Sequence, residues 1–202
     1  GNWLCGVCGS KPITAVPMGR GIAMTRQMII NDDLGAFLQR ARVIGAAARR
    51  TVNEDVYAKL AANPTMSDTG ALFNATAVTT DGGHANYTSS GTAISVASIA
   101  VGEGLMALQK DAGLKTTLNL APRFLLAPRT KKQIAWDVLN SPTDIASSNS
   151  AKRNYAASLG LELITDAELD KASTTAWYLA ADPMQAPLIE VDFLNGVDTP
   201  QV

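Results

Sequence analysis

The chain of 202 residues is 47% hydrophobic and 17% charged, which suits one globular domain, or two small ones, around a sizeable core. Two cysteines and a single histidine argue against a disulfide scaffold and histidine-rich metal chemistry, and a net charge of −1 is no signature of general nucleic-acid binding. The apolar runs are far shorter than the roughly 18 residues of a membrane-spanning helix, and no secretion signal is visible.

The first third of the chain is predicted to form an extended segment and then a long helix. Residues 13–30 have the pattern of two strand pieces joined by a turn. Asn31, Asp32 and Asp33 supply helix-capping chemistry, and apolar residues then recur every three or four positions until Asn63 and Pro64 stop the pattern. We therefore predict a helix over about 32–62, roughly 45 Å long at about 1.5 Å per residue.

One feature inside this helix leaves an alternative open. Thr51 and Glu54 have the spacing of a capping box, in which a side chain at a helix start and one three residues later bond each other's backbone. The segment is therefore either one helix or two helices that meet near Thr51.

The rest of the chain alternates loops, helices and strands. Residues 63–95 have the composition of a long loop in which only 71–73 resembles a strand, and so long a loop is often functional. We predict a helix over 95–112 that ends at Gly113, and another that opens with a capping-box spacing at 130–133 and ends at 141–142. Strands are predicted over 118–127, 161–164, 177–181 and 188–194. This order predicts an α+β fold with a mixed sheet.

The charges are unevenly distributed along the chain. Residues 1–63 carry eight basic and four acidic residues, a balance of +4, whereas residues 160–202 carry one basic and eight acidic residues, a balance of −7. A basic front and an acidic rear favour head-to-tail association between copies, because opposite potentials steer and align the partners. Two solvated faces that never meet would give the same pattern, so charge alone leaves both interpretations open.

No group of residues forms a recognisable catalytic motif. Cys5 and Cys8 have the spacing of a redox or zinc pair, but no strand can precede them and further metal ligands are scarce. His84 lies in a polar loop without a nucleophile motif, and helix capping explains Asp32 and Asp33. We predict no catalytic, cofactor-binding or metal-binding residues.

Arginines of the long predicted helix lie largely off its apolar stripe. They are either solvated or in contact with a neighbouring subunit or phosphates; they are Arg40, Arg42, Arg49 and Arg50.

Several short segments, taken in order, resemble the major capsid subunit of Mu-like tailed phages. They are Thr25–Phe37, Leu60–Pro64, Asp68–Phe73, His84–Asn86, Leu118–Pro128, Trp177–Pro183 and Phe193–Gly196. Each segment is short, and the resemblance rests on their common order over about residues 20–200. The same family also occurs fused behind a prohead protease, so the chain is either a head subunit or a fragment of such a fusion.

The resemblance implies a Hong Kong 97-type capsid fold. In that fold a long spine helix (about 32–62 here) belongs to a peripheral domain, and a mixed α/β axial domain meets its copies around five-fold and six-fold axes. We expect residues 13–94 to form a partial peripheral domain and residues 95–202 the axial domain. Residues 1–12 would be a terminal segment, either native or an addition. Because family members extend further on both sides, we expect this fold to be incomplete at both ends.

The resemblance also implies a function. We expect a non-enzymatic, self-assembling shell protein of a phage or prophage head, needing no cofactor, that forms pentamers and hexamers around double-stranded DNA without sequence specificity. Its other partners would be portal, scaffold or prohead protease, with no membrane. It would reside in the virion, and in the host bacterial cytoplasm during assembly. The alternative is a small cytosolic hydrolase or binding domain that uses the 63–95 loop and His84.

Overall fold

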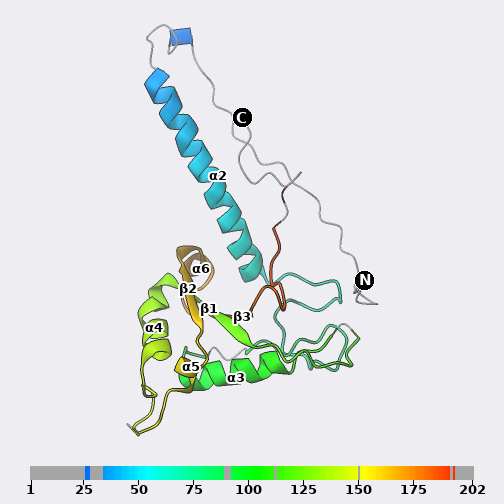
Figure 1. Cartoon of the computed structure of the whole chain (residues 1–202). Coiled ribbons are helices and arrows are strands. Elements are labelled where there is room, and N and C mark those ends of the chain that lie inside the picture. Colours follow the sequence, from blue (N-terminus) through cyan, green and yellow to red (C-terminus); the bar gives the residue numbers. More distant parts are fainter. Residues whose placement is uncertain are drawn as a thin grey trace. The chain divides into compact units, whose positions relative to one another are not determined.

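The computed structural model describes residues 26–27, 34–88, 92–111, 113–149, 151–191 and 193, and gives the backbone alone at 34–38, 40 and 41. In chain order the elements are α2 (Leu34–Ala62), α3 (Val96–Ala107), β1 (Pro122–Pro128), a 3-10 turn (Arg129–Lys131), α4 (Lys132–Asn140), α5 (Tyr155–Ser158), β2 (Glu162–Asp166), α6 (Ala167–Ala172) and β3 (Tyr178–Ala181) (Figure 1). The predicted combination of helices with a mixed sheet is confirmed.

The chain divides into two compact units. One comprises residues 1–11 and 57–190, and the other comprises residues 12–56 and 191–202, so the division falls inside α2. The three strands and the helices α3 to α6 lie in the 57–190 unit.

The sheet of the 57–190 unit has three strands in the order β2-β1-β3. β1 pairs in parallel with β2, with Leu125 opposite Leu163, and antiparallel with β3, with Leu125 opposite Leu179. The parallel pair requires a crossover, which α4 and α5 supply. The sheet is mixed because its middle strand, β1, has one parallel and one antiparallel neighbour.

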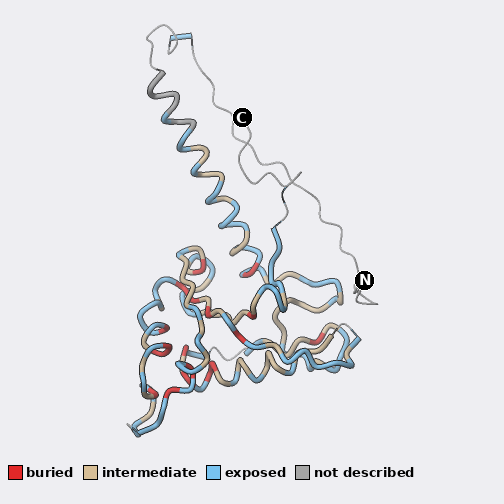
Figure 2. Tube along the Cα trace, in the orientation of Figure 1, coloured by how far each residue is buried: buried red, intermediate tan, exposed pale blue. Residues whose placement is uncertain are grey.

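The hydrophobic core of this unit is built around β1. Leu125 and Ala127 of β1 are fully buried, and so are Ile99 of α3 and Ala135 of α4. Figure 2 shows buried positions along the strands, at the start of α3 and on α4. The cluster comprises Ile94, Val96, Ile99, Leu125, Ala127, Ala135, Val138, Leu139 and Ala156. These residues place α3 and α4 on the same core.

The long helix α2 is continuous. It covers 29 residues, close to the predicted 32–62, and ends before Asn63, whose φ of 48° is left-handed. The Thr51 hydroxyl donates to the Ala47 carbonyl at 3.1 Å instead of capping a new helix, so the break near Thr51 is not present.

Two predicted helix boundaries are wrong. α3 stops at Ala107 rather than Ala112, because the chain turns into a bridge between Lys110 and Thr117. No capping box opens α4, because the Thr130 hydroxyl donates to Asp170 Oδ1 at 2.6 Å. A capping box does open α3: Ser95 and Ser98 each accept a hydrogen bond from the other's N–H.

Some predicted strands also differ from the structure. Residues 188–191 and 193 form no strand, since no ladder partner lies beside them within the described residues. The strand predicted over 118–127 begins only at Pro122. Ala71 makes a single bridge, to Thr65, rather than a strand over 71–73. Most of the extended segment over 13–30 lies outside the described residues, and Arg26 and Gln27 within it are helical.

Candidate functional site

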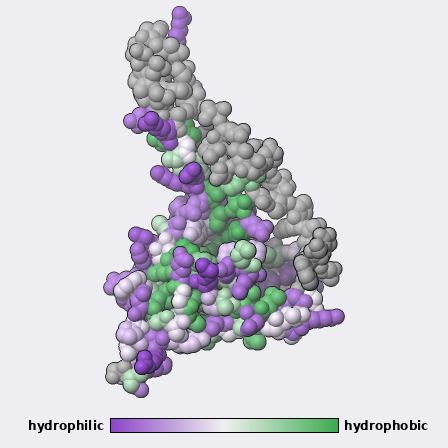
Figure 3. Space-filling model, viewed as in Figure 1, coloured by the Kyte–Doolittle hydropathy of each residue, from purple (hydrophilic) through white to green (hydrophobic). Residues whose placement is uncertain are grey.

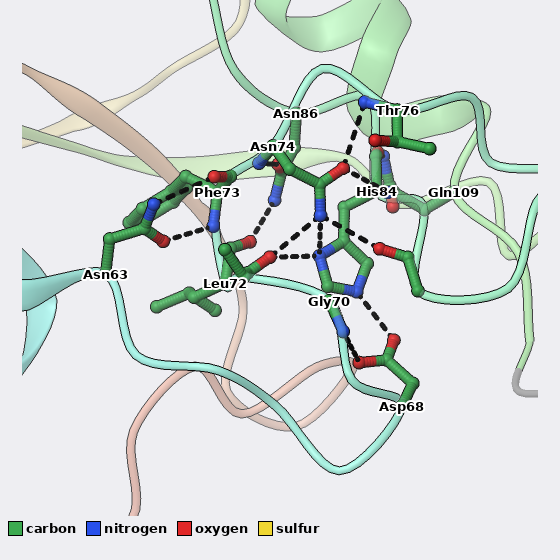
Figure 4. Close-up of polar contacts among 12 residues, drawn as sticks. Asn63, Asp68, Gly70, Leu72, Phe73, Asn74, Thr76, His84, Asn86 and Gln109 are labelled. Atoms are coloured by element: carbon green, nitrogen blue, oxygen red, sulfur yellow. Dashed lines mark hydrogen bonds and ion pairs between the residues drawn. The ribbon is translucent and has the colours of Figure 1, made fainter.

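Side-chain hydrogen bonds are concentrated in the long loop that follows α2. It consists of two adjoining loops, 63–73 and 74–86, which Gln109 fastens to the end of α3 (Figure 4). We call these residues the polar loop cluster. It contains His84, which the sequence singled out as a possible catalytic residue.

Asn63 closes the first loop. Its side-chain oxygen accepts from the Phe73 N–H at 2.6 Å, and its side-chain nitrogen donates to the Phe73 carbonyl at 2.9 Å. The side-chain amide of Asn63 therefore bonds both the N–H and the carbonyl of Phe73, as the backbone of a neighbouring strand would. The loop it closes is tightened by a backbone bond from Met66 N–H to Gly70 O at 2.7 Å.

Asn74 is the centre of the second loop. Its side-chain oxygen accepts from the backbone N–H groups of Thr76 and His84, at 3.1 and 2.9 Å. Its side-chain nitrogen donates to the carbonyls of Ala71 and Gly82, at 2.8 and 2.9 Å. The amide therefore uses both acceptor sites and both donors on backbone groups that have no regular secondary structure.

The two loops approach each other so closely that glycine is required where they cross, because a Cβ on Gly70 would lie 2.0 Å from the Gly82 carbonyl oxygen. Glycine is also required within the second loop, where a Cβ on Gly83 would lie 2.0 Å from the Ala77 carbonyl oxygen. The side chain of Asn86 joins the two loops further: it accepts a hydrogen bond from the Asn74 N–H at 3.0 Å and donates one to the Leu72 carbonyl at 2.8 Å.

His84 bonds through both of its ring nitrogens. Nε2 lies 2.9 Å from Asp68 Oδ2, and Nδ1 lies 2.8 Å from the Ala71 carbonyl oxygen (Figure 4). Both neighbours are acceptors, so the doubly protonated ring satisfies both of them, whereas either neutral tautomer satisfies one. The Asn74 amide nitrogen also lies 3.1 Å from Nδ1.

The carboxylate of Asp68 is held in its ionised form. Burial by itself would raise the pKa of Asp68, but hydrogen bonds from His84 and from the Gly70 N–H, together with the charge of His84, lower it below its ordinary value. The side chain of Asp68 is 38% exposed and that of His84 21% exposed, so water reaches the pair and screens it.

This geometry suits a structural role better than catalysis. A general base needs a lone pair directed at a substrate, and both nitrogens of His84 already point at Asp68 and Ala71. A shallow, open depression on the unit is lined by Trp136, Asp137, Asn140, Ser141 and Ile145, none of which belongs to the polar loop cluster.

The other residues weighed in the sequence are not brought to this site. Cys5, Cys8, Asp32 and Asp33 lie outside the described residues, and the side chain of Arg40 is not described. Arg42, Arg49 and Arg50 are exposed on α2. Within the part of the chain that the structure describes, no group of three or more His, Cys, Asp or Glu is arranged to hold a metal ion.

Sequence reasoning identified His84 and the loop but missed the residues that organise them. No motif marks Asn63, Asn74 or Gln109. Asparagine is common in loops, so its presence alone does not show which residues organise a loop. The signal that could have located them is local: Asn63 occupies a left-handed helix end, and Asn74 precedes a turn that closes at Gly82 and Gly83.

The comparisons with known proteins point to one family. A model of the phage capsid protein family matches residues 10–202. No curated protein and no solved structure matches the chain. None of the helices in the described residues is both long enough and apolar enough to cross a membrane. The match covers nearly the whole sequence, and we conclude that the chain belongs to the phage capsid protein family.

Proposed function

We propose that the chain is a self-assembling subunit of a tailed-phage or prophage head, related to the Mu-like major capsid proteins and folded in the Hong Kong 97 manner. The observation that carries this proposal is the family match over residues 10–202, which makes a structural role in an oligomeric capsid the function of the chain. The finer statements, on assembly, fold type and relatives, rest on the resemblance of the sequence segments described above.

In this proposal α2 is the spine helix. Its 29 uninterrupted residues, at about 1.5 Å each, extend about 43 Å, long enough to serve as a strut rather than as a core helix. Residues 13–94 would form the partial peripheral domain and residues 95–202 the axial domain, with residues 1–12 as a terminal segment. The three-stranded sheet and the helices packed on it supply the mixed α/β body of the axial domain.

The charge distribution supports head-to-tail contacts between copies. Residues 1–63 carry a balance of +4 and residues 160–202 a balance of −7. In a ring of identical subunits the front of one copy meets the rear of the next, so opposite charges stabilise every contact in the ring. Pentamers and hexamers built this way would enclose double-stranded DNA without reading its sequence.

The remaining partners follow from the same role. We propose that portal, scaffold or prohead protease contact the shell during assembly in the host cytoplasm, and that the finished protein resides in the virion. The polar loop cluster would then be a rigid structural loop. The alternative, a hydrolase that uses His84, has no support from the family match.

Light scattering and microscopy test the proposal. The chain, expressed from its whole reading frame, is purified and its mass is measured by multi-angle light scattering, followed by negative-stain microscopy of the large species. Rings or shells are expected. His84→Gln is the companion variant: a shell subunit assembles with it, whereas an enzyme loses a hydrolytic activity while its mass stays unchanged. A chain that remains monomeric under all assembly conditions would overturn the proposal.

A further inference from the structure

Helix α3 is apolar around its whole circumference, but the 57–190 unit covers only one side of it. Between Val96 and Ala107 the single charged residue is Glu103. Val96, Ser98 and Ile99 are buried against the core. A helix without a polar face is normally covered on all sides, and no described residue of the chain covers the outer side of α3.

The uncovered side of α3 forms a continuous stripe. Its exposed residues are Ala97, Val101, Gly104 and, at the cap, Leu108, which follow each other at spacings of four, three and four and so lie on one face. Val101 is 61% exposed and Leu108 60% exposed. In the face shown in Figure 3, apolar side chains lie among polar ones over the part of the unit where Figure 1 places α3. We call these four residues the α3 stripe.

The two glycines in the second half of α3 have different surroundings. A Cβ on Gly102 would lie 2.6 Å from Leu179 Cδ1, so packing against β3 explains that glycine. A Cβ on Gly104 would meet nothing within 4 Å. Glycine in a helix interior is unfavourable relative to alanine, so Gly104 carries a penalty that no contact among the described residues explains. A notch at Gly104 admits a large side chain from outside.

A second exposed apolar surface lies on α4 and the loop after it. Trp136 is 56% exposed, Ile145 is 54% exposed, and both line the shallow depression described above. Lys132 lies one helical turn before Trp136 on the same face and is also exposed. We call Lys132, Trp136 and Ile145 the α4 surface.

We propose that the α3 stripe of one copy packs against the α4 surface of a second copy of this chain, with Trp136 seated at Gly104. This inference rests on the proposed function, because a closed ring requires a contact between two different surfaces of the same chain. The two surfaces complement each other in shape, a large aromatic ring against a glycine notch. They also complement each other in charge: Glu103, which accepts a hydrogen bond from the Tyr155 hydroxyl at 2.8 Å, directly precedes Gly104, and Lys132 lies one helical turn before Trp136.

The position of the two helices makes the contact intermolecular. α3 contacts β3 and α5, whereas α4 contacts β1, β2 and α5, and both bury their inner sides in the same core (Figure 1). Their outer sides therefore face away from the core in different directions. Tryptophan is one of the residue types enriched among those that dominate interface energies, which favours Trp136 as the anchor.

Cysteine cross-linking tests the contact directly. In a background with Cys5→Ser and Cys8→Ser, the pair Glu103→Cys and Lys132→Cys, which leaves Gly104 and Trp136 in place, is oxidised under assembly conditions and analysed on denaturing gels. A ladder of covalent multimers is expected. The matched control replaces Lys132→Cys by Met184→Cys, because Met184 is 93% exposed and belongs to neither surface. No ladder, or an equal ladder from the control pair, would overturn the contact.

A second variant tests the notch itself. Gly104→Leu fills open space and leaves the fold intact, which a thermal melt of the dissociated chain checks. We expect it to raise the concentration needed for half-assembly by at least about tenfold, while Met184→Leu leaves it unchanged. Normal assembly of Gly104→Leu would overturn the contact and leave the proposed function standing. A wild-type chain that never assembles would overturn both.

Discussion

The 57–190 unit contains two regions that are held together by opposite means. The core around β1 is made of apolar side chains with almost no exposure, such as Leu125 and Ile99. The polar loop cluster has few buried apolar residues, and side-chain amides hold its backbone in place, above all Asn74. The first region depends on volume and burial, and the second on the completeness of its hydrogen bonds.

This difference predicts different responses to damage. Apolar contacts are many and individually weak, so a core loses stability in proportion to the volume removed. In the loops one amide serves four backbone groups, so its removal leaves several partners unsatisfied at once. One substitution in each region therefore tests how that region is stabilised.

The largest effect is expected in the core. Leu125 is fully buried in the middle strand, between β2 and β3. Leu125→Ala should lower the free energy of unfolding of the dissociated chain by about 2–5 kcal/mol, because it removes buried methyl groups and leaves a cavity. Urea unfolding followed by circular dichroism measures the change, with Met184→Ala as the exposed control. A loss below about 1 kcal/mol would mean that β1 is not the centre of the core.

The second largest effect is expected at Asn74. Asn74→Ala leaves two N–H groups and two carbonyls without their partner, and water can replace only part of the loss. We expect a loss of about 2–3 kcal/mol in the same urea experiment, together with faster amide exchange at His84. Asn149→Ala is the matched control, because the exposed Asn149 side chain accepts one hydrogen bond, from the Ala151 N–H. Equal losses in the two variants would contradict the central position of Asn74.

The sequence predicts the first region better than the second. Apolar periodicity located α2 within two residues of its observed start and located β2 and β3, since burial imposes a regular pattern on regular elements. It missed α5 and α6, which have four and six residues and are too short to show a period. Both begin with a side-chain cap, from Asn154 and Asp166, and this local signal was the only one available.

The polar loop cluster could not be assembled from the sequence. Its contacts join residues ten or more positions apart, such as Asn63 with Phe73 and Asp68 with His84. No periodicity links such residues, and the composition of the loop is that of any polar loop. Only the glycines of the loop are a local signal, because Gly70 and Gly83 lie where the backbone passes too close to another backbone segment for a side chain.

A third prediction concerns Gly104 of α3, which belongs neither to the core around β1 nor to the polar loop cluster. Gly104→Ala should raise the free energy of unfolding of the dissociated chain by about 1 kcal/mol, because alanine is the better helix former and the new methyl group meets nothing. Gly102→Ala is the matched variant, and its gain should be smaller because the new methyl group would displace Leu179. Thermal melts of the two variants measure the difference. A larger gain at Gly102 than at Gly104 would contradict the assignment of the two faces of α3.

The smallest effect is expected at the Asp68–His84 pair, and it depends on pH. The pKa of Asp68 is lower in the folded chain than its ordinary value, so the pair stabilises the fold above that ordinary value, near 3.8, and the contribution disappears as the pH falls through the folded pKa. Asp68→Asn should therefore cost less than about 1 kcal/mol at pH 7, since the pair is partly exposed, and less at pH 3 than at pH 7. Urea unfolding at both pH values measures the difference between wild type and variant. In the His84→Gln background the effect of Asp68→Asn at pH 7 should shrink, because the coupling between the two side chains has been removed. A loss that is the same at both pH values and in both backgrounds would mean that Asp68 acts only through the Gly70 N–H, as the cap of its own turn.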